Sequence, residues 1–217
     1  MSAWLPVLTG AFGLVAGLLV AARLGRRPLR SAWRIRGPRD LVAPLAGAVV
    51  CAALAVRFGA VPVLPAYLYL ALVSLPLAAI DVEQHRLPDA LTLPSYPVAL
   101  VLLGAAALAG GQGRRMLSAL AGLAALGALY ALLHLLDRRG MGLGDVKLAG
   151  VLGAYLGWLG VDAWLVGAVL GVLLGGLTAL VLLALRRVTA KSHLPFGPFM
   201  IAGALVAVLL SGQHLLL

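Results

Sequence analysis

The sequence predicts an all-α, polytopic integral membrane protein with about eight transmembrane helices. Of its 217 residues, 63% are hydrophobic and 11% are charged, and the mean hydropathy is +1.07. An ordinary soluble domain carries about 25% charged residues, so this composition excludes that class. The apolar residues also gather in runs close to the roughly 20 residues that cross a bilayer as a helix. We therefore interpret residues 1–217 as a single membrane domain.

Eight apolar runs follow one another along the chain, and each is interpreted as a membrane helix. The first run ends in AARLGRR without an obvious cleavage site, which favours a retained helix over a removed signal peptide. The sixth run is short and glycine-rich, which leaves two arrangements open: a tilted helix, or one longer bent unit with the seventh run. The eight runs span approximately residues 3–22, 41–56, 61–80, 91–109, 116–136, 146–160, 163–185 and 198–210.

Basic residues fall between the apolar runs, so the net charge of +10 indicates membrane topology rather than a nucleic-acid partner. The segment 23–40 carries seven arginines, and positively charged loops stay cytoplasmic. With this basic loop inside, alternation places both termini outside, and Asp81 and Asp145 at the cytoplasmic membrane edge. Three of the 17 basic residues then lie outside, namely Arg57, Arg114 and Arg115.

Carboxylates inside membrane proteins are costly unless paired or hydrated, so each of the seven acids is a candidate functional residue. Asp81 closes one apolar run abruptly, and Asp145 stands between a glycine-rich turn and another run. These two have the least adequate structural explanations. The remaining acids are better explained as helix caps or solvated loop charges; they are Asp40, Glu83, Asp89, Asp137 and Asp162.

Asp145 lies in the stretch GMGLGDVKLAG. A purely structural role is open, because Gly-Asp before an apolar helix is an acceptable N-cap. Alternatively, Gly142 and Gly144 would let a substrate backbone approach the carboxylate closely. Two nearby carboxylates can share one proton, one activating water while the other protonates a carbonyl oxygen. Because Asp145 precedes a helix and Asp81 follows one, the helix dipoles predict that Asp145 is ionised and Asp81 carries the proton.

Three motifs in order, IDVEQHRLPDALTLP, GMGLGDVKLAG and PFGPF, resemble those of the type IV prepilin peptidases, aspartyl proteases of the GxGD kind. The resemblance covers about residues 62–217, which would form the catalytic core. It implies that Asp81 and Asp145 are catalytic and that Gly142 and Gly144 complete GxGD. It also implies cleavage of the basic leader of type IV prepilins or pseudopilins after a glycine, at the cytoplasmic face of the bacterial inner membrane.

The chain departs from the longer members of that family, which carry an N-terminal domain with paired CxxC motifs. Its one cysteine, Cys51, lies in an apolar run, so no protein metal site is expected. Many members also methylate the new N-terminus with S-adenosylmethionine, and the missing cysteines put that activity in doubt. Proteolysis itself requires no cofactor. The expected partners are the prepilin substrate and the lipid bilayer, without nucleic acid.

Four further residues are candidates for tuning the carboxylates or contacting the substrate. His85 lies four positions after Asp81, although a loop histidine is more often a solvated group. Lys147 follows Asp145 and has an alternative role at the membrane interface. Pro195 and Gly197 belong to PFGPF, whose simplest role is to begin the last helix.

Three other functions are open. A small secondary transporter could use membrane carboxylates as a proton relay, but such acids usually lie near the bilayer midplane or between repeated halves. A presenilin-like intramembrane protease shares the GxGD motif, but its first aspartate lies within a helix in a YD setting. A noncatalytic assembly factor would need a dead site, and here both acids are present.

Overall fold

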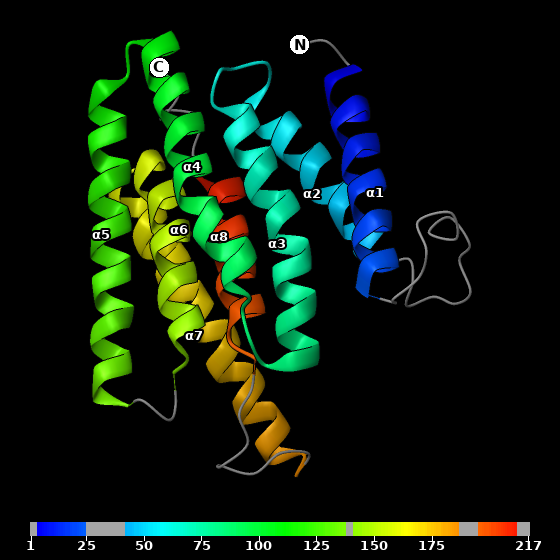
Figure 1. Cartoon of the computed structure of the whole chain (residues 1–217), viewed down its shortest axis with the longest axis vertical. Coiled ribbons are helices and arrows are strands. Elements are labelled where there is room, and N and C mark those ends of the chain that lie inside the picture. The colour runs from blue at the N-terminus through cyan, green and yellow to red at the C-terminus, as the bar shows by residue number, and fades with distance from the viewer. Residues whose placement is uncertain (1–3, 25–41, 138–140, 187–194, 212–217) are drawn as a thin grey trace. The chain divides into compact units, whose positions relative to one another are not determined.

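The computed structural model describes residues 4–24, 42–137, 141–186 and 195–211, which form eight α-helices and no strand (Figure 1). This confirms the predicted all-α class and the number of helices, and each helix overlaps one predicted run. The helices are α1 (Trp4–Leu24), α2 (Val42–Phe58), α3 (Leu64–Gln84), α4 (Asp89–Gly110), α5 (Gly113–Leu136), α6 (Leu143–Leu159), α7 (Val161–Ala184) and α8 (Gly197–Leu210).

The chain divides into two compact units, residues 1–79 and 80–217. In the first unit α1 packs along α2, and a Cβ atom on either Gly13 or Gly47 would overlap the other's backbone. Small residues permit this close approach of apolar helices in a bilayer. Phe58 and Tyr67 stack with ring centroids 4.5 Å apart, and so link the end of α2 to the start of α3.

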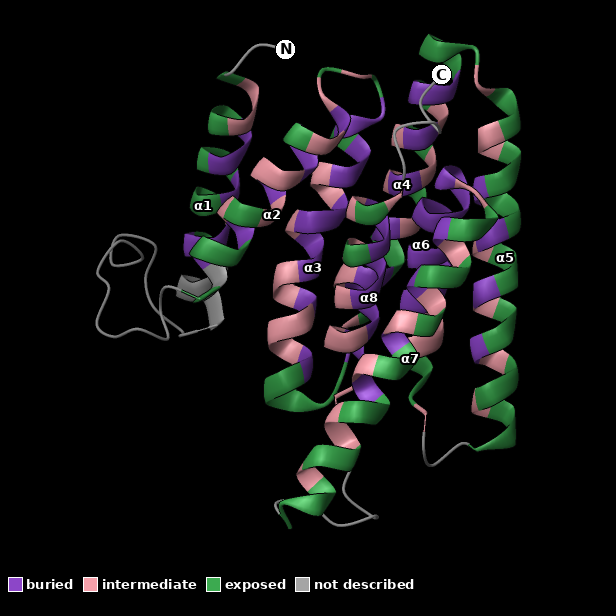
Figure 2. Cartoon of the chain, turned by 180° about the vertical axis from the view of Figure 1, so that it is seen from behind, coloured by how far each residue is buried: buried purple, intermediate pink, exposed green. Residues whose placement is uncertain are grey.

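The second unit is built around α6. Every residue of this helix from 148 to 159 is buried, and α6 contacts α4, α5, α7 and α8 (Figure 2). A helix that is apolar on all sides needs such surroundings. Glycines bring its neighbour close, because a Cβ atom on Gly153 would overlap the Gly122 carbonyl of α5. The first turn of α6 is thus held on a deeply packed element.

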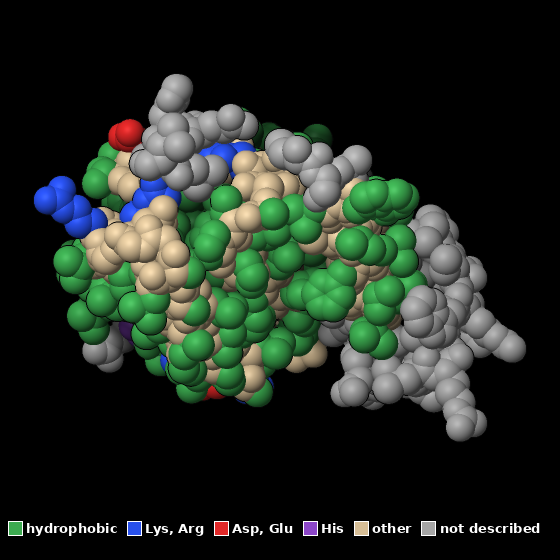
Figure 3. All heavy atoms as spheres, turned by 90° about the horizontal axis from the view of Figure 1, so that it is seen from above, with side chains coloured by type: hydrophobic (Ala, Val, Ile, Leu, Met, Phe, Trp, Pro, Cys, Tyr) green, Lys and Arg blue, Asp and Glu red, His purple; other side chains and the backbone are tan. Residues whose placement is uncertain are grey.

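Within the described part of the chain, four helices are long and apolar enough to cross a membrane, by length and composition: α3, α4, α5 and α7. Their outward faces remain apolar, as at Leu108 on α4, Leu117 on α5 and Leu177 on α7, which are all exposed. Figure 3, a view from above, also shows exposed hydrophobic side chains, beside backbone atoms and a few basic side chains. These surfaces suit contact with lipid, as expected for a polytopic membrane protein.

The structure decides between the two arrangements left open for the sixth run, and it corrects the predicted position of Asp81. α6 and α7 are separate helices rather than one bent unit, because Gly160 between them has φ 111°, a value that favours glycine. α3 continues to Gln84, so Asp81 lies inside its last turn instead of following the helix. An aspartate position within a helix therefore does not separate this chain from presenilin-like proteases. The predicted boundaries of the basic loop and of the catalytic core stay predictions.

Candidate active site

Asp81 is buried in the last turn of α3, with 4% of its surface exposed. The backbone N–H of Gly197, at the start of α8, donates a hydrogen bond of 3.0 Å to its Oδ2 atom. A Cβ atom on Gly197 would lie 2.8 Å from the same oxygen. The sequence PFGPF therefore brings a donor to the carboxylate at a position that tolerates no side chain.

Asp145 lies in the first turn of α6 and is half-buried. Gly142, not Asp145, is the N-cap residue, and its N–H donates to Asp145 Oδ2 at 3.3 Å. In return, the N–H of Asp145 donates to the Gly142 carbonyl at 3.1 Å. This is half of a capping box, so the structural role considered for Asp145 is partly present. It leaves the other carboxylate oxygen open to further partners.

Leu87 was not among the residues predicted for the site, and it packs against both Gly144 of GMGLGD and Gly197 of PFGPF. It is buried, and a Cβ atom on Gly144 would lie 2.9 Å from its Cβ atom. A Cβ atom on Gly197 would lie 3.4 Å from its Cδ1 atom. Gly144 thus makes room for Leu87, whereas the sequence suggested room for a substrate. The only indication of this role in the sequence is that Leu87 is an apolar residue between Arg86 and Pro88.

A pocket of about 360 Å³ opens beside both carboxylates. Its lining residues come from the last turn of α3, the connection from α3 to α4, the first turn of α4 and the start of α6. His85 enters it from a left-handed backbone conformation, with φ 51°, and is exposed. The described residues lining the pocket are Asp81, His85, Arg86, Leu87, Asp89, Gly142, Leu143, Gly144, Asp145 and Lys147. The two predicted carboxylates therefore share one cavity, with four other charged or ionisable side chains in its lining.

The environment of Asp145 disfavours its charged form. Burial and, to a lesser extent, the negative charge of Asp81 together raise the pKa of Asp145 from 3.8 to about 6, although the hydrogen bond from the Gly142 N–H lowers it. The helix dipole had predicted the opposite direction. Burial and a like charge outweigh a dipole contribution of about 0.3–1 kcal/mol. The two carboxyl groups are electrostatically coupled and titrate as a pair.

The remaining candidate residues divide between the pocket and its surroundings. Lys147 contacts Asp89, which was predicted to cap α4 but makes no capping hydrogen bond. Pro195 is half-buried just before α8, and neither it nor Gly197 is among the described residues that line the pocket. No three His, Cys, Asp or Glu side chains in the described part of the chain gather as a metal site. Asp40, which was predicted as a cap or loop residue, and most of the basic loop lie outside the described residues.

Comparisons with known proteins relate the chain to one family. A family model described as the type IV leader peptidase family matches residues 66–184. The prepilin leader peptidase/N-methyltransferase of Aeromonas salmonicida (strain A449) is 34% identical over 174 residues, 78% of this chain and 56% of that protein. The protein of the same name from Pseudomonas aeruginosa is 31% identical over 187 residues, 82% of this chain and 60% of its own length. The chain spans about half the length of the curated relatives it matches, and no solved structure matches it.

Proposed function

Because this chain belongs to the type IV leader peptidase family, we propose that it is a membrane aspartyl endopeptidase that removes the basic leader of type IV prepilins or pseudopilins. One observation carries the proposal. Asp81 and Asp145, from α3 and α6, line a single pocket, and the charge of one raises the pKa of the other. Coupled carboxylates of this kind are the machinery of aspartyl proteolysis.

The proposed chemistry uses the pair in the state that holds one proton. The ionised carboxylate removes a proton from water, whose oxygen attacks the scissile carbonyl, while the protonated carboxyl donates its proton to the carbonyl oxygen. Collapse of the tetrahedral intermediate then breaks the C–N bond and releases the amine after protonation. Since burial and mutual repulsion disfavour a doubly ionised pair, the site can keep one proton near neutral pH.

The substrate would place its leader on the pocket and its apolar helix in the bilayer beside the enzyme. Both acids lie at helix ends, Asp81 in the last turn of α3 and Asp145 in the first turn of α6. We infer that these ends face the cytoplasm, because that orientation puts most basic residues inside. Acids at helix ends suit a cut at the membrane edge better than a proton relay through the midplane.

Methylation is a separate proposal. The names of the relatives include N-methyltransferase, but this chain spans about half of their length. S-adenosylmethionine would be needed if the activity is retained. The mass of the processed substrate reports it, because a transferred methyl group adds a fixed increment to the new N-terminus.

The test is co-expression with type IV prepilins followed by intact-mass measurement of the substrate. We expect the wild-type chain to remove the leader and both Asp81→Asn and Asp145→Asn to leave it attached. Asp162→Asn is the matched control, because Asp162 is an exposed acid in the first turn of α7. Expression and membrane insertion of the variants must match the wild type.

Two results would count against the proposal. Substrate that stays intact across several prepilins with a folded enzyme would favour a transporter or a noncatalytic assembly factor. If cleavage survives both substitutions, the GxGD stretch has only a structural role at the beginning of α6.

A further inference from the structure

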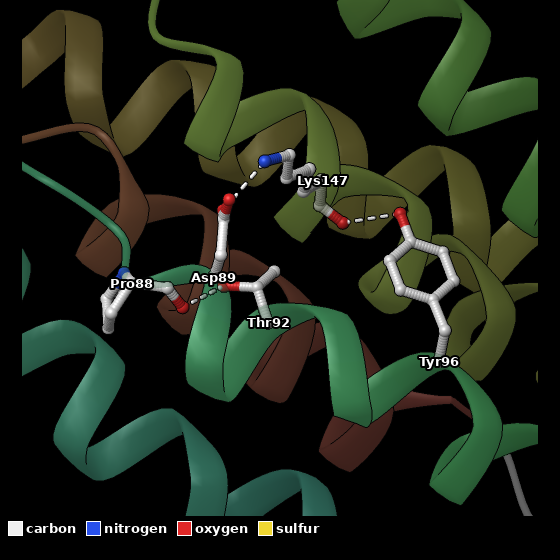
Figure 4. A network of polar contacts seen from close by, with 5 residues as sticks. All are labelled: Pro88, Asp89, Thr92, Tyr96 and Lys147. Carbon is white, nitrogen blue, oxygen red and sulfur yellow. Dashed lines mark hydrogen bonds and ion pairs between the residues drawn. The ribbon is translucent and has the colours of Figure 1, made fainter.

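A polar network joins α4 to the first turns of α6, two residues from Asp145 (Figure 4). The Nζ atom of Lys147 lies 2.7 Å from Asp89 Oδ1 in an ion pair. The Tyr96 hydroxyl donates a hydrogen bond of 2.7 Å to the Lys147 carbonyl oxygen. One residue of α6 is thus held at its side chain and at its backbone by two residues of α4.

Beneath this network, α4 and α6 pack so closely that the contact leaves no room for a larger residue at Gly150. A Cβ atom on Gly150 would overlap the Tyr96 hydroxyl, so glycine is required for the ring to reach the Lys147 carbonyl. The hydroxyl therefore bonds α6 at a place where the two helices touch directly. Thr92, on the same side of α4, is buried and donates to the Pro88 carbonyl at 3.0 Å, which ties down the turn that carries Asp89.

The ion pair is partly open to solvent, with 32% of the Lys147 side chain and 60% of the Asp89 side chain exposed. Exposed ion pairs contribute little to folding stability. Asp89 and Lys147 both line the catalytic pocket, so their contact lies where a small change in geometry affects the reacting groups. Because this ion pair contributes little to folding stability, it is better suited to fixing the position of nearby groups in the pocket than to stabilising the fold.

We propose that Asp89, Tyr96 and Lys147 form a clamp that fixes the first turn of α6 and so places the Asp145 carboxylate opposite Asp81. They are positioning residues and act through Lys147 on its neighbour Asp145. The inference rests on the proposed peptidase activity. The clamp would link α4 to α6 and so keep the carboxyl groups of Asp81 and Asp145 at a fixed distance from each other.

Kinetics provide the first test. We expect Tyr96→Phe, Asp89→Asn and Lys147→Gln each to lower kcat by about ten-fold with KM within about two-fold, because misplaced groups slow chemistry more than binding. Exchanging the charges in Asp89→Lys/Lys147→Asp should recover part of the loss seen in either single change. Asp162→Asn is the control. A raised KM at unchanged kcat would overturn the proposal and make Asp89 a contact for the basic leader instead.

A second measurement reports position without activity. In a Cys51→Ala background, Asp81→Cys and Asp145→Cys are joined by thiol cross-linkers of graded length. We expect the shortest effective linker to react several-fold more slowly when Tyr96→Phe or Lys147→Gln is added, while the melting temperature stays within about two degrees. Unchanged cross-linking together with unchanged kcat would refute the clamp. This readout remains valid if no prepilin is cleaved, so failure of the clamp and failure of the peptidase proposal are distinguishable.

Discussion

The backbone N–H of Gly197 donates a buried hydrogen bond of 3.0 Å to the carboxylate of Asp81. This contact joins the start of α8 to the last turn of α3, within the unit formed by residues 80–217. It supplies one donor to a carboxylate that is otherwise removed from solvent. Such a bond orients the oxygen that accepts it and leaves the other oxygen for chemistry.

Gly197→Ala is therefore expected to damage the site more than the fold. The added Cβ atom would lie 2.8 Å from Asp81 Oδ2, so either the carboxylate or α8 must move. A displacement approaching 1 Å costs roughly 100-fold in rate. Prepilin cleavage measured by substrate mass over time gives the effect. Gly176→Ala is the matched control, since a Cβ atom there meets nothing within 4 Å; equal activity of the two variants would contradict the expectation.

The pKa of Asp145 predicts that this residue reduces stability at neutral pH. The folded chain holds its proton up to about pH 6, whereas the unfolded chain releases it near 3.8. Between these values the folded state binds more protons, so its stability falls as pH rises and the penalty is complete above pH 6. A shift of this size is of the order of 1–3 kcal/mol.

Asp145→Asn should consequently raise the melting temperature at pH 8 and change it little at pH 4, where the wild-type carboxyl is largely neutral. The measurement is intrinsic tryptophan fluorescence of the detergent-solubilised protein on heating. Asp162→Asn should show no such pH-dependent gain, because Asp162 is exposed. Identical effects of Asp145→Asn at both pH values would show that burial does not disfavour the Asp145 charge.

The contact between α5 and α6 predicts opposite effects for one substitution at two places. Gly153→Ala would push a Cβ atom into the Gly122 carbonyl and to 2.9 Å from Leu126 Cβ, and should destabilise the fold by about 1–3 kcal/mol. Gly104→Ala on α4 meets nothing within 4 Å and should stabilise its helix by about 0.5–1 kcal/mol. Thermal unfolding of both variants in one detergent decides the signs. Equal shifts would mean that α5 and α6 are not in close contact here.

Most of the helical architecture could be predicted because lipid imposes a length and a composition that are visible in the sequence. The position of Asp81 was less accessible, since α3 continues through charged residues to Gln84 where hydropathy suggests a loop. The raised pKa of Asp145 could not be predicted, because a helix end is visible in the sequence whereas burial depends on residues brought together by folding. Which of the two carboxyl groups holds the proton stays a prediction.

Contacts between distant segments were the least predictable part of the site. Nothing in the letters around Asp89 distinguishes a helix cap from a partner of Lys147, because both explanations need an acid in the first turn of α4. Leu87 is one apolar residue in a charged stretch, and its contacts with Gly144 and Gly197 appear only once three segments meet. The motifs predicted that Asp81 and Asp145 belong to one site, and both line the same pocket. The packing around them could be described only from the fold.

The membrane orientation gives the last prediction. With the basic loop cytoplasmic, the end of α3 lies inside and the turn between α4 and α5 lies outside. Glu83 and Gln112 mark these two ends, and the one native cysteine, Cys51, is buried and easily replaced by alanine. In that background Glu83→Cys should resist a membrane-impermeant maleimide added to intact spheroplasts and react after lysis, whereas Gln112→Cys should react in both. The opposite pattern would place Asp81 and Asp145 at the outer face, where a leader still attached in the cytoplasm cannot reach them. Arg114 and Arg115 would then be the residues that mark the cytoplasmic side.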